Sequence, residues 1–251
     1  MINSVEAAAK ILLRSKYIIA LTGSGISAES GIPTFRGKDG LWSKYKPEEL
    51  ATPYAFARNP KLVWEWYSWR MKLIKEAKPN PAHITLAKLQ NMRIIKTLIT
   101  QNIDDLHERA GSRDIIKLHG DIFTVRCINC IFTQKLTNPP IEIPPKCPRC
   151  GAYLRPDVVW FGESLSPEII NKAFIEAEKA DAILVIGTSG VVMPAGLIPK
   201  VVKDNGGKVI EINIEETVIT SYADLFLKSK AGEILPKIFE KIMEIRRSRH
   251  V

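Results

Sequence analysis

Residues 17–28 read YIIALTGSGISA, and this stretch decides the fold. The apolar, β-branched run at 17–21 predicts a buried strand. Gly23, Gly25 and Ala28 follow it with the spacing G-x-G-x-x-G/A. Such glycines let the backbone approach a pyrophosphate, which the start of the next helix stabilises. We therefore predict the first strand–loop–helix unit of a dinucleotide-binding domain, although ordinary glycine turns produce the same motif.

Similar apolar runs alternate with helical patterns along the rest of the chain. Strands are predicted at 94–99, 115–118, 158–161, 183–186, 209–214 and 225–227. Helices are predicted at 5–14, 83–91, 167–179, 197–205 and 233–247. Several runs are apolar on both faces, as in a parallel sheet covered by helices on each side. The fold class is α/β, a Rossmann-like doubly wound parallel sheet.

Two stretches interrupt this alternation. Residues 36–82 hold all but one of the tryptophans and look helical, and residues 121–157 hold all the cysteines and a cluster of prolines. We predict a large, dinucleotide-binding domain from 1–35, 83–120 and 158–251. A smaller second domain then consists of the helical insertion 36–82 and a zinc-binding module at 121–157.

The cysteines form C-x2-C, sixteen residues and C-x2-C, with members Cys127, Cys130, Cys147 and Cys150. Thiolates two residues apart on a tight turn can reach one tetrahedral ion. Two disulfides or four buried thiols are the alternatives, and an N-terminus without a secretory signal argues against disulfides. Four thiolates complete the shell, so one structural zinc per chain is expected.

Composition narrows the class of protein. The chain has 251 residues, 45% hydrophobic and 25% charged, with a net charge of +9. Glycine, proline and polar residues interrupt the least charged stretch, 182–199, so no membrane span is predicted and a cytoplasmic location is expected. The charge fits a nucleic-acid face, an anionic cofactor or a lysine-rich surface. A lysine-rich surface is the preferred explanation of the charge, and direct nucleic-acid binding is not expected.

Polar groups follow several predicted strands. In ordinary dehydrogenases an Asp or Glu about 20 residues after the glycine motif binds the ribose of the cofactor. No strand that ends in such an acidic residue occurs here, so an ordinary dehydrogenase is disfavoured. Groups that could hold a sugar, an adenosine or a proton occur later, although strand-end turns explain them too. They are Gln101, Asn102, Asp104, His119, Gly187, Thr188, Ser189, Asn213 and Glu215.

The motifs GSGIS (23–27), GIPTFRG (31–37), TQNID (100–104), KLHG (117–120), the cysteines, RPDVVWFGE (155–163) and IGTS (186–189) occur in this order. With them the chain resembles the sirtuin family of NAD-dependent protein lysine deacylases over about residues 16–231. The resemblance implies a cleft between a Rossmann domain and a small domain, with NAD as a consumed co-substrate. The implied partners are acyl-lysine-bearing proteins, chromatin-associated ones among them.

The resemblance also implies residue roles. The acyl oxygen attacks the nicotinamide ribose and expels nicotinamide; His119 is then the general base, and 2′-O-acyl-ADP-ribose is released. Asn102 joins His119 in catalysis and, with Gln101, positions the ribose, while Asp104 and Ile103 hold the carboxamide. Phe35 shields the reacting centre and Arg36 faces phosphate. The other implied NAD contacts are Gly23, Ser24, Gly25, Ala28, Glu29, Gly187, Thr188, Ser189, Asn213, Ile214, Glu215 and Ala231.

The acyl and peptide contacts come from two further segments. Tyr67 and Arg70 lie at i and i+3 on a predicted helix, where a phenol and a guanidinium suit a carboxylate. This Tyr-x-x-Arg resembles the sirtuin class that removes succinyl, malonyl or glutaryl groups; the alternative is a core tyrosine and a solvated arginine. The implied peptide contacts are Val158, Val159, Phe161, Gly162 and Val191, which add the substrate as a strand.

Two other functions remain open from the sequence. NAD-dependent mono-ADP-ribosyl transfer shares the step in which nicotinamide leaves, and a requirement for an acyl-lysine peptide would separate the two activities. A zinc-ribbon protein that binds nucleic acid is the non-enzymatic alternative, and salt-dependent DNA binding without nicotinamide release would support it.

Overall fold

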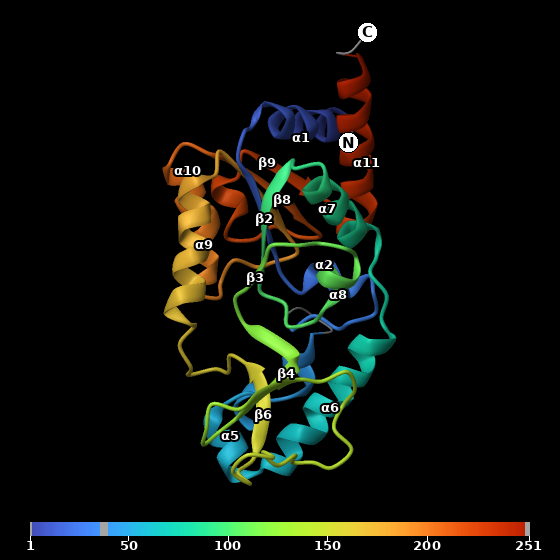
Figure 1. Ribbon diagram of the computed structural model, residues 1–251. Coiled ribbons are helices and arrows are strands. Elements are labelled where there is room, and N and C mark those ends of the chain that lie inside the picture. Colours follow the sequence, from blue (N-terminus) through green and yellow to red (C-terminus); the bar gives the residue numbers. More distant parts are fainter. Residues whose placement is uncertain (1, 36–39, 249–251) are drawn as a thin grey trace.

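A computed structural model describes residues 2–35 and 40–248 of the chain. A six-stranded sheet, parallel in every pair, forms its centre (Figure 1). The strands in spatial order are β3 (Ile115–Lys117), β2 (Ile95–Thr100), β1 (Ile18–Thr22), β7 (Ala182–Ile186), β8 (Lys208–Asn213) and β9 (Leu225–Lys228). The order reverses between β1 and β7, and at such a switch point the carboxyl ends of neighbouring strands border a crevice.

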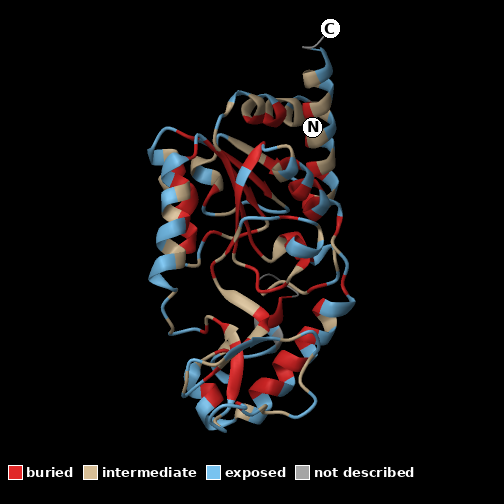
Figure 2. Ribbon diagram, viewed as in Figure 1, coloured by how far each residue is buried: buried red, intermediate tan, exposed pale blue. Residues whose placement is uncertain are grey.

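Helices cover both faces of this sheet. Ile18 and Ala20 of β1 belong to an apolar cluster with the helices α1 (Ile2–Arg14), α7 (Pro81–Asn91) and α11 (Ala231–Ser248). Ile19 and Leu21 belong to the opposite cluster with α9 (Pro167–Lys179) and α10 (Ile198–Asp204). The strands are therefore apolar on both sides, and Figure 2 shows them buried between the helices. The predicted Rossmann-like sheet is confirmed.

A second, smaller sheet and a set of short helices form the other end of the molecule. In this sheet β4 (Gly120–Cys127) pairs antiparallel with both β5 (Thr133–Lys135) and β6 (Leu154–Val158). Four helices pack beside it: α3 (Leu41–Lys44), α4 (Pro47–Leu50), α5 (Pro53–Arg58) and α6 (Pro60–Glu76). We call this part the small region; its core contains Trp64, Met71 and Val125.

The strand predicted at 158–161 is wrong. Val158 ends β6 of the small sheet, and residues 159–162 form a loop that turns at Gly162, where φ is +85°. The apolar run has a different cause, because Trp160 packs its ring against Phe56 in the small core, with centroids 5.3 Å apart. Phe161 is exposed. The apolar character of residues 159–161 is therefore due to aromatic packing and not to a strand of the large sheet.

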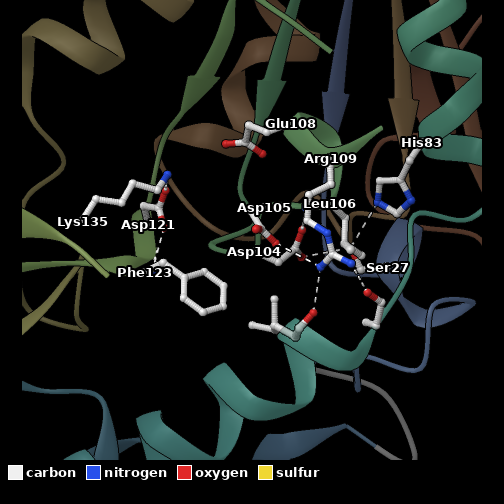
Figure 3. Close-up of polar contacts among 12 residues, drawn as sticks. Ser27, His83, Asp104, Asp105, Leu106, Glu108, Arg109, Asp121, Phe123 and Lys135 are labelled. Carbon is white, nitrogen blue, oxygen red and sulfur yellow. Dashed lines mark hydrogen bonds and ion pairs between the residues drawn. The ribbon is translucent and has the colours of Figure 1, made fainter. Parts of the chain in front are cut away.

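The ends of α6 are well defined, which fixes the side chains along it. Asn59 accepts a hydrogen bond from the Leu62 backbone N–H at 3.1 Å, and Pro60 occupies the first helical position. At the other end Arg109, from α8 (Leu106–Arg109), donates to the carbonyls of Ile74 and Ala77. Arg109 thereby connects α8 to the small region (Figure 3).

Within the described residues, no helix combines the length and apolar character that crossing a membrane requires.

Candidate functional site

A cavity of about 1140 Å³ lies where the carboxyl ends of the large sheet face the small region. The end of β8 and the residues that follow β1, β2, β3, β7, β8 and β9 line it together with α6 and the loop after β6. The candidate base His119 lies on its wall. So do the predicted NAD contacts Gly23, Ser24, Gly25, Ala28, Glu29, Phe35, Gln101, Asn102, Ile103, Gly187, Thr188, Ser189, Asn213, Ile214, Glu215 and Ala231.

Most of the predicted substrate contacts line the same cavity: Tyr67, Arg70, Val158, Val159, Phe161 and Gly162. Val191 is exposed beside the cavity and does not line it. Asp104 lies behind the wall, and Arg36 is outside the described residues. The structure therefore brings together residues more than 200 positions apart in the chain, from Gly23 to Ala231.

The glycine loop after β1 needs its glycines for packing. A Cβ on Gly23 would lie 2.7 Å from the Gly187 oxygen, and one on Gly25 would lie 2.7 Å from the Gly187 Cα. Gly187 itself has a φ of +60°, in the left-handed region that favours glycine. The two loops after β1 and β7 thus touch through their backbones, and residues of both loops line the cavity.

His119 follows β3 and lies on the cavity wall. Its Nδ1 is 2.8 Å from the carbonyl oxygen of Gln101. A carbonyl can only accept, so Nδ1 carries the proton in the neutral ring and Nε2 keeps its lone pair. Burial lowers the pKa of His119 from its usual value, while the bond to Gln101 opposes that change. The neutral ring, with Nε2 as an acceptor, is therefore the main form at pH 7.

Asn102 and Asp104 belong to a buried hydrogen-bond network. The Asn102 amide donates to the Gly23 carbonyl at 3.1 Å and to Ser27 Oγ at 3.2 Å. Ser27 Oγ in turn donates to Asp104 at 3.0 Å, and the Leu106 N–H donates to Asp104 at 3.1 Å (Figure 3). Burial raises the pKa of Asp104. The network fixes the loop after β2 against the glycine loop.

Two other histidines lie behind this network. His83 is the third residue of α7 and forms a capping box with Asn80. His107 is 2.9 Å from the Thr22 hydroxyl through Nε2, and its ring centroid lies 4.9 Å from that of His83. Burial lowers the pKa of both, that of His83 to about 4. Both are buried, and neither lines the cavity.

Tyr67 and Arg70 project from α6 into the opposite end of the cavity. They are 2% and 3% exposed, so the alternative of a solvated arginine is wrong. The Arg70 guanidinium lies 4.5 Å from the Phe35 ring centroid, and its Nη1 has no hydrogen-bond partner among the described residues. Burial lowers the pKa of Arg70 to about 10, which leaves it charged at pH 7. Arg70 forms no ion pair with the described residues, although the Asp104 carboxylate acts on it at longer range, so this end of the cavity suits an anion.

The remaining NAD candidates lie at the ends of β8 and β9. Asn213 donates to the Thr188 carbonyl at 3.0 Å, and Gln101 donates to the Thr188 hydroxyl at 2.8 Å. Glu29 accepts a hydrogen bond from the Gly232 N–H at 2.7 Å, in the first turn of α11. Its carboxylate therefore stabilises the start of that helix.

The sulfur atoms of the four cysteines gather in the small region. All four lie within 4.8 Å of one another. Cys127 Sγ is 3.4 Å from Cys150 Sγ, and Cys130 Sγ is 3.7 Å from Cys147 Sγ. A disulfide needs about 2.05 Å. Tetrahedral zinc with bonds of about 2.3 Å separates its sulfurs by about 3.8 Å. The residues present therefore fit one structural zinc ion.

Sequence reasoning missed several residues on the cavity wall. Ser229 and Lys230 follow β9, and the rule that ligands bind at the carboxyl ends of parallel strands would have found them. Thr34 lies beside Phe35 in the loop between the glycine motif and the small region. Trp160 carries no local signal, because its contact with Tyr67 joins residues 93 positions apart.

The chain matches the model of the Sir2 family over residues 23–194. An NAD-dependent protein deacylase of Pyrococcus abyssi is 60% identical, over 95% of this chain and 97% of that protein. A Sir2 homologue in complex with NAD is 52% identical with a TM-score of 0.91, over 96% of this chain and 94% of that one.

Two other similar structures contain an acyl group, one on ADP-ribose and one on a peptide. A Sir2 protein with a deacetylated p53 peptide and 3′-O-acetyl ADP-ribose is 32% identical, with a TM-score of 0.89 over 95% of this chain and 98% of that one. A Sir2 protein bound to a myristoylated histone peptide is 37% identical, with a TM-score of 0.82 over 99% of this chain and all of that one.

Proposed function

Because the chain belongs to the Sir2 family, we propose that it is an NAD-dependent protein lysine deacylase. It removes acetyl groups and, with preference, succinyl and malonyl groups from lysine. NAD and one water molecule are consumed, and the products are nicotinamide, free lysine and 2′-O-acyl-ADP-ribose. The substrates are acyl-lysine-bearing proteins, chromatin-associated ones among them, in line with the histone peptide bound by a similar structure.

The observation that carries this proposal is the hydrogen bond from His119 Nδ1 to the Gln101 carbonyl, at 2.8 Å on the wall of the cavity. It leaves Nε2 as a proton acceptor at neutral pH. In the proposed reaction the acyl oxygen first displaces nicotinamide from the ribose of NAD. His119 then removes a proton from a hydroxyl of that ribose, whose oxygen attacks the acyl carbon. The carbonyl of Gln101 holds the imidazole in the tautomer that this step needs.

The remaining walls divide between the two substrates. The loops after β1, β7 and β8 hold the adenosine and pyrophosphate, because their glycines and hydroxyls offer an open polar cradle. Asn102 positions the nicotinamide ribose, and Ile103 on the wall, with Asp104 directly behind it, holds the carboxamide. The peptide adds as a strand between residues 158–162 and Val191. The division into domains at 35/36, 82/83, 120/121 and 157/158 is part of this proposal.

The acyl preference rests on Arg70. Its guanidinium is buried, and Nη1 has no hydrogen-bond partner among the described residues. A carboxylate at the far end of a succinyl or malonyl group would supply the missing acceptor and counterion, with Tyr67 beside it. Acetyl lacks that carboxylate, so it leaves Arg70 unpaired. This difference favours dicarboxylic acyl groups.

Incubation with NAD and a panel of acyl-lysine peptides, followed by mass spectrometry, tests the proposal. We expect NAD-dependent loss of the acyl mass and formation of acyl-ADP-ribose, faster for succinyl- and malonyl-lysine than for acetyl-lysine. Unmodified lysine peptides are the matched control, because they can accept ADP-ribose but have no acyl group to lose. Consumption of NAD with ADP-ribosylated protein and no deacylation would contradict the proposal in favour of ADP-ribosyl transfer.

A further inference from the structure

Trp160 makes a direct hydrogen bond to the hydroxyl of Tyr67. Its Nε1 lies 2.8 Å from the Tyr67 oxygen, and both side chains are buried on the cavity wall. An indole N–H can only donate, so the Tyr67 oxygen is the acceptor. The phenolic proton must then point to another acceptor. Across residues 2–35 and 40–248 the structure shows none for it.

The Tyr67 proton stays in place over the physiological range. Burial raises the pKa of Tyr67 to about 12. Arg70 lies one helical turn further along the same side of α6, and its Nη1 also lacks a hydrogen-bond partner among the described residues. Two donors from one helix therefore border this end of the cavity without acceptors in the part of the chain that the structure describes. Their natural ligand is an anionic group with two oxygens.

The indole that directs the Tyr67 hydroxyl is itself held firmly. The Arg155 guanidinium lies 3.4 Å from the centroid of the Trp160 ring and pairs with Glu163 at 2.5 Å. Glu163 also accepts a hydrogen bond from the Trp160 backbone N–H at 2.8 Å. The ring and the backbone of Trp160 are thus held by one partly buried ion pair, which fixes the direction of the indole N–H.

We propose that Trp160 is a positioning residue that sets the acyl selectivity of the enzyme. Its N–H occupies a lone pair of the Tyr67 oxygen and so directs the Tyr67 proton toward the distal carboxylate of a succinyl or malonyl group. This inference rests on the proposed function, in which Tyr67 and Arg70 receive that carboxylate. An acetyl group offers no acceptor there, so the effect is confined to dicarboxylic acyl groups.

The test compares kcat/KM for succinyl- and acetyl-lysine peptides in Trp160→Phe, Tyr67→Phe and the double variant. Loss of a neutral hydrogen bond should lower the succinyl-to-acetyl ratio of Trp160→Phe about three- to tenfold. In the Tyr67→Phe background the same change should lower the ratio no further, because the indole acts through that hydroxyl. Benzothienylalanine at position 160, which replaces the N–H by sulfur at nearly constant shape, should reproduce the effect if the phenylalanine variant folds poorly.

Trp64→Phe is the matched control. Trp64 is fully buried on α6, and its Nε1 donates to the Leu154 carbonyl at 2.8 Å, but it does not line the cavity. This variant loses an equivalent hydrogen bond and should lower the thermal midpoint without changing the succinyl-to-acetyl ratio. Comparable losses toward both acyl groups in Trp160→Phe would mean a purely structural role and would overturn the inference.

Two further outcomes separate this inference from the proposed function. If Tyr67→Phe lowers the ratio but Trp160→Phe does not, or if their effects add, Trp160 has no role in selectivity and the carboxylate pocket stands. If the wild-type protein removes acetyl but not succinyl or malonyl groups, both the pocket and the role of Trp160 are wrong.

Discussion

The large sheet and the small region meet at one cavity but contribute different chemistry to it. On the side of the large sheet, Asn102, Asp104 and His119 each have hydrogen-bond partners at about ordinary lengths. On the side of the small region, Arg70 Nη1 is buried without a partner among the described residues. Under the proposed function, the first side is organised before any ligand arrives, whereas the second is completed by the acyl group. The proposal therefore assigns general reaction chemistry to the sheet and substrate choice to the small region.

The two parts also differ in what holds them together. The sheet has apolar clusters on both faces, each covered by helices. The core of the small region includes Cys127 and Cys147, whose sulfurs belong to the four-cysteine group. Hydrophobic burial accounts for the first part, while the second combines an apolar core with a metal site.

Loss of zinc should produce the largest effect and should affect the small region alone. Cys147→Ala removes one of four ligands, and zinc contributes on the order of 10 kcal/mol to the folding of small zinc domains. We expect loss of one zinc per chain by metal analysis. Tryptophan fluorescence should report early unfolding, because every tryptophan lies at 42–69 or at 160, outside the large sheet.

Arg149→Ala is the control for this experiment, since it changes an exposed residue between two cysteines and leaves all four sulfurs. It should keep its zinc and its unfolding midpoint. A Cys147→Ala protein with full zinc content, or with unchanged fluorescence on heating, would contradict the assignment.

His119→Ala tests the side of the large sheet and should have the next largest effect. Loss of a general base lowers kcat by about 10²- to 10⁴-fold. Both acetyl and succinyl peptides should lose activity to a similar extent, because the base acts on the sugar and not on the acyl group. Calorimetric titration should show that NAD still binds. Wild-type turnover in this variant would remove His119 from the mechanism.

Arg70→Met tests the opposite side of the cavity. It keeps the length of the side chain and removes the charge. Loss of a charge-assisted hydrogen bond costs about 1.5–3 kcal/mol, so desuccinylation should fall roughly ten- to a hundredfold in kcat/KM. Deacetylation should change little.

Arg70→Lys is the graded control, because it keeps the charge but loses the planar fork. It should lie between the wild type and Arg70→Met. Equal losses toward both acyl groups would show that Arg70 supports the fold or NAD binding instead.

The large sheet could be predicted from the sequence because its signal is local. Runs such as 182–186 are apolar on both faces, and polar residues such as His119 follow directly at the strand ends. The cysteine spacing is equally local, and the sulfurs do gather. No short stretch of sequence indicates which residues these side chains contact across the cavity.

The small region was harder to predict because aromatic packing imitates strand patterns. Trp160 made 158–161 look like a strand, yet its ring packs on Phe56 and its N–H bonds to Tyr67. The partnerships of Ser27 with Asp104 and of Trp160 with Tyr67 span 77 and 93 residues. Only the folded chain brings such pairs together, so hydrogen-bond partners and the loss of the predicted strand required the structure.

The smallest expected effect is a pH dependence that separates the two sides of the cavity. Burial lowers the pKa of His119 below its usual 6.5, and the base must be neutral to accept a proton. Deacetylation kcat/KM should therefore be nearly constant from pH 7 to 8 and should fall as the pH drops through a pKa below 6.5, by about tenfold per further unit. Tyr67 and Arg70, with pKa values of about 12 and about 10, do not titrate in this window.

The fall of kcat/KM at low pH, the acid limb of the profile, thus arises on the side of the large sheet. Asp104 is the other group there whose titration could cause it, because burial raises its pKa. The residual activity of His119→Ala distinguishes the two groups. If His119 causes the limb, that residual activity should be flat from pH 5.5 to 8, and Arg70→Met should keep the wild-type limb. A limb that persists without His119 would assign the titration to Asp104 or to another group, and a wild-type midpoint above pH 7 would contradict a histidine whose pKa is lowered by burial.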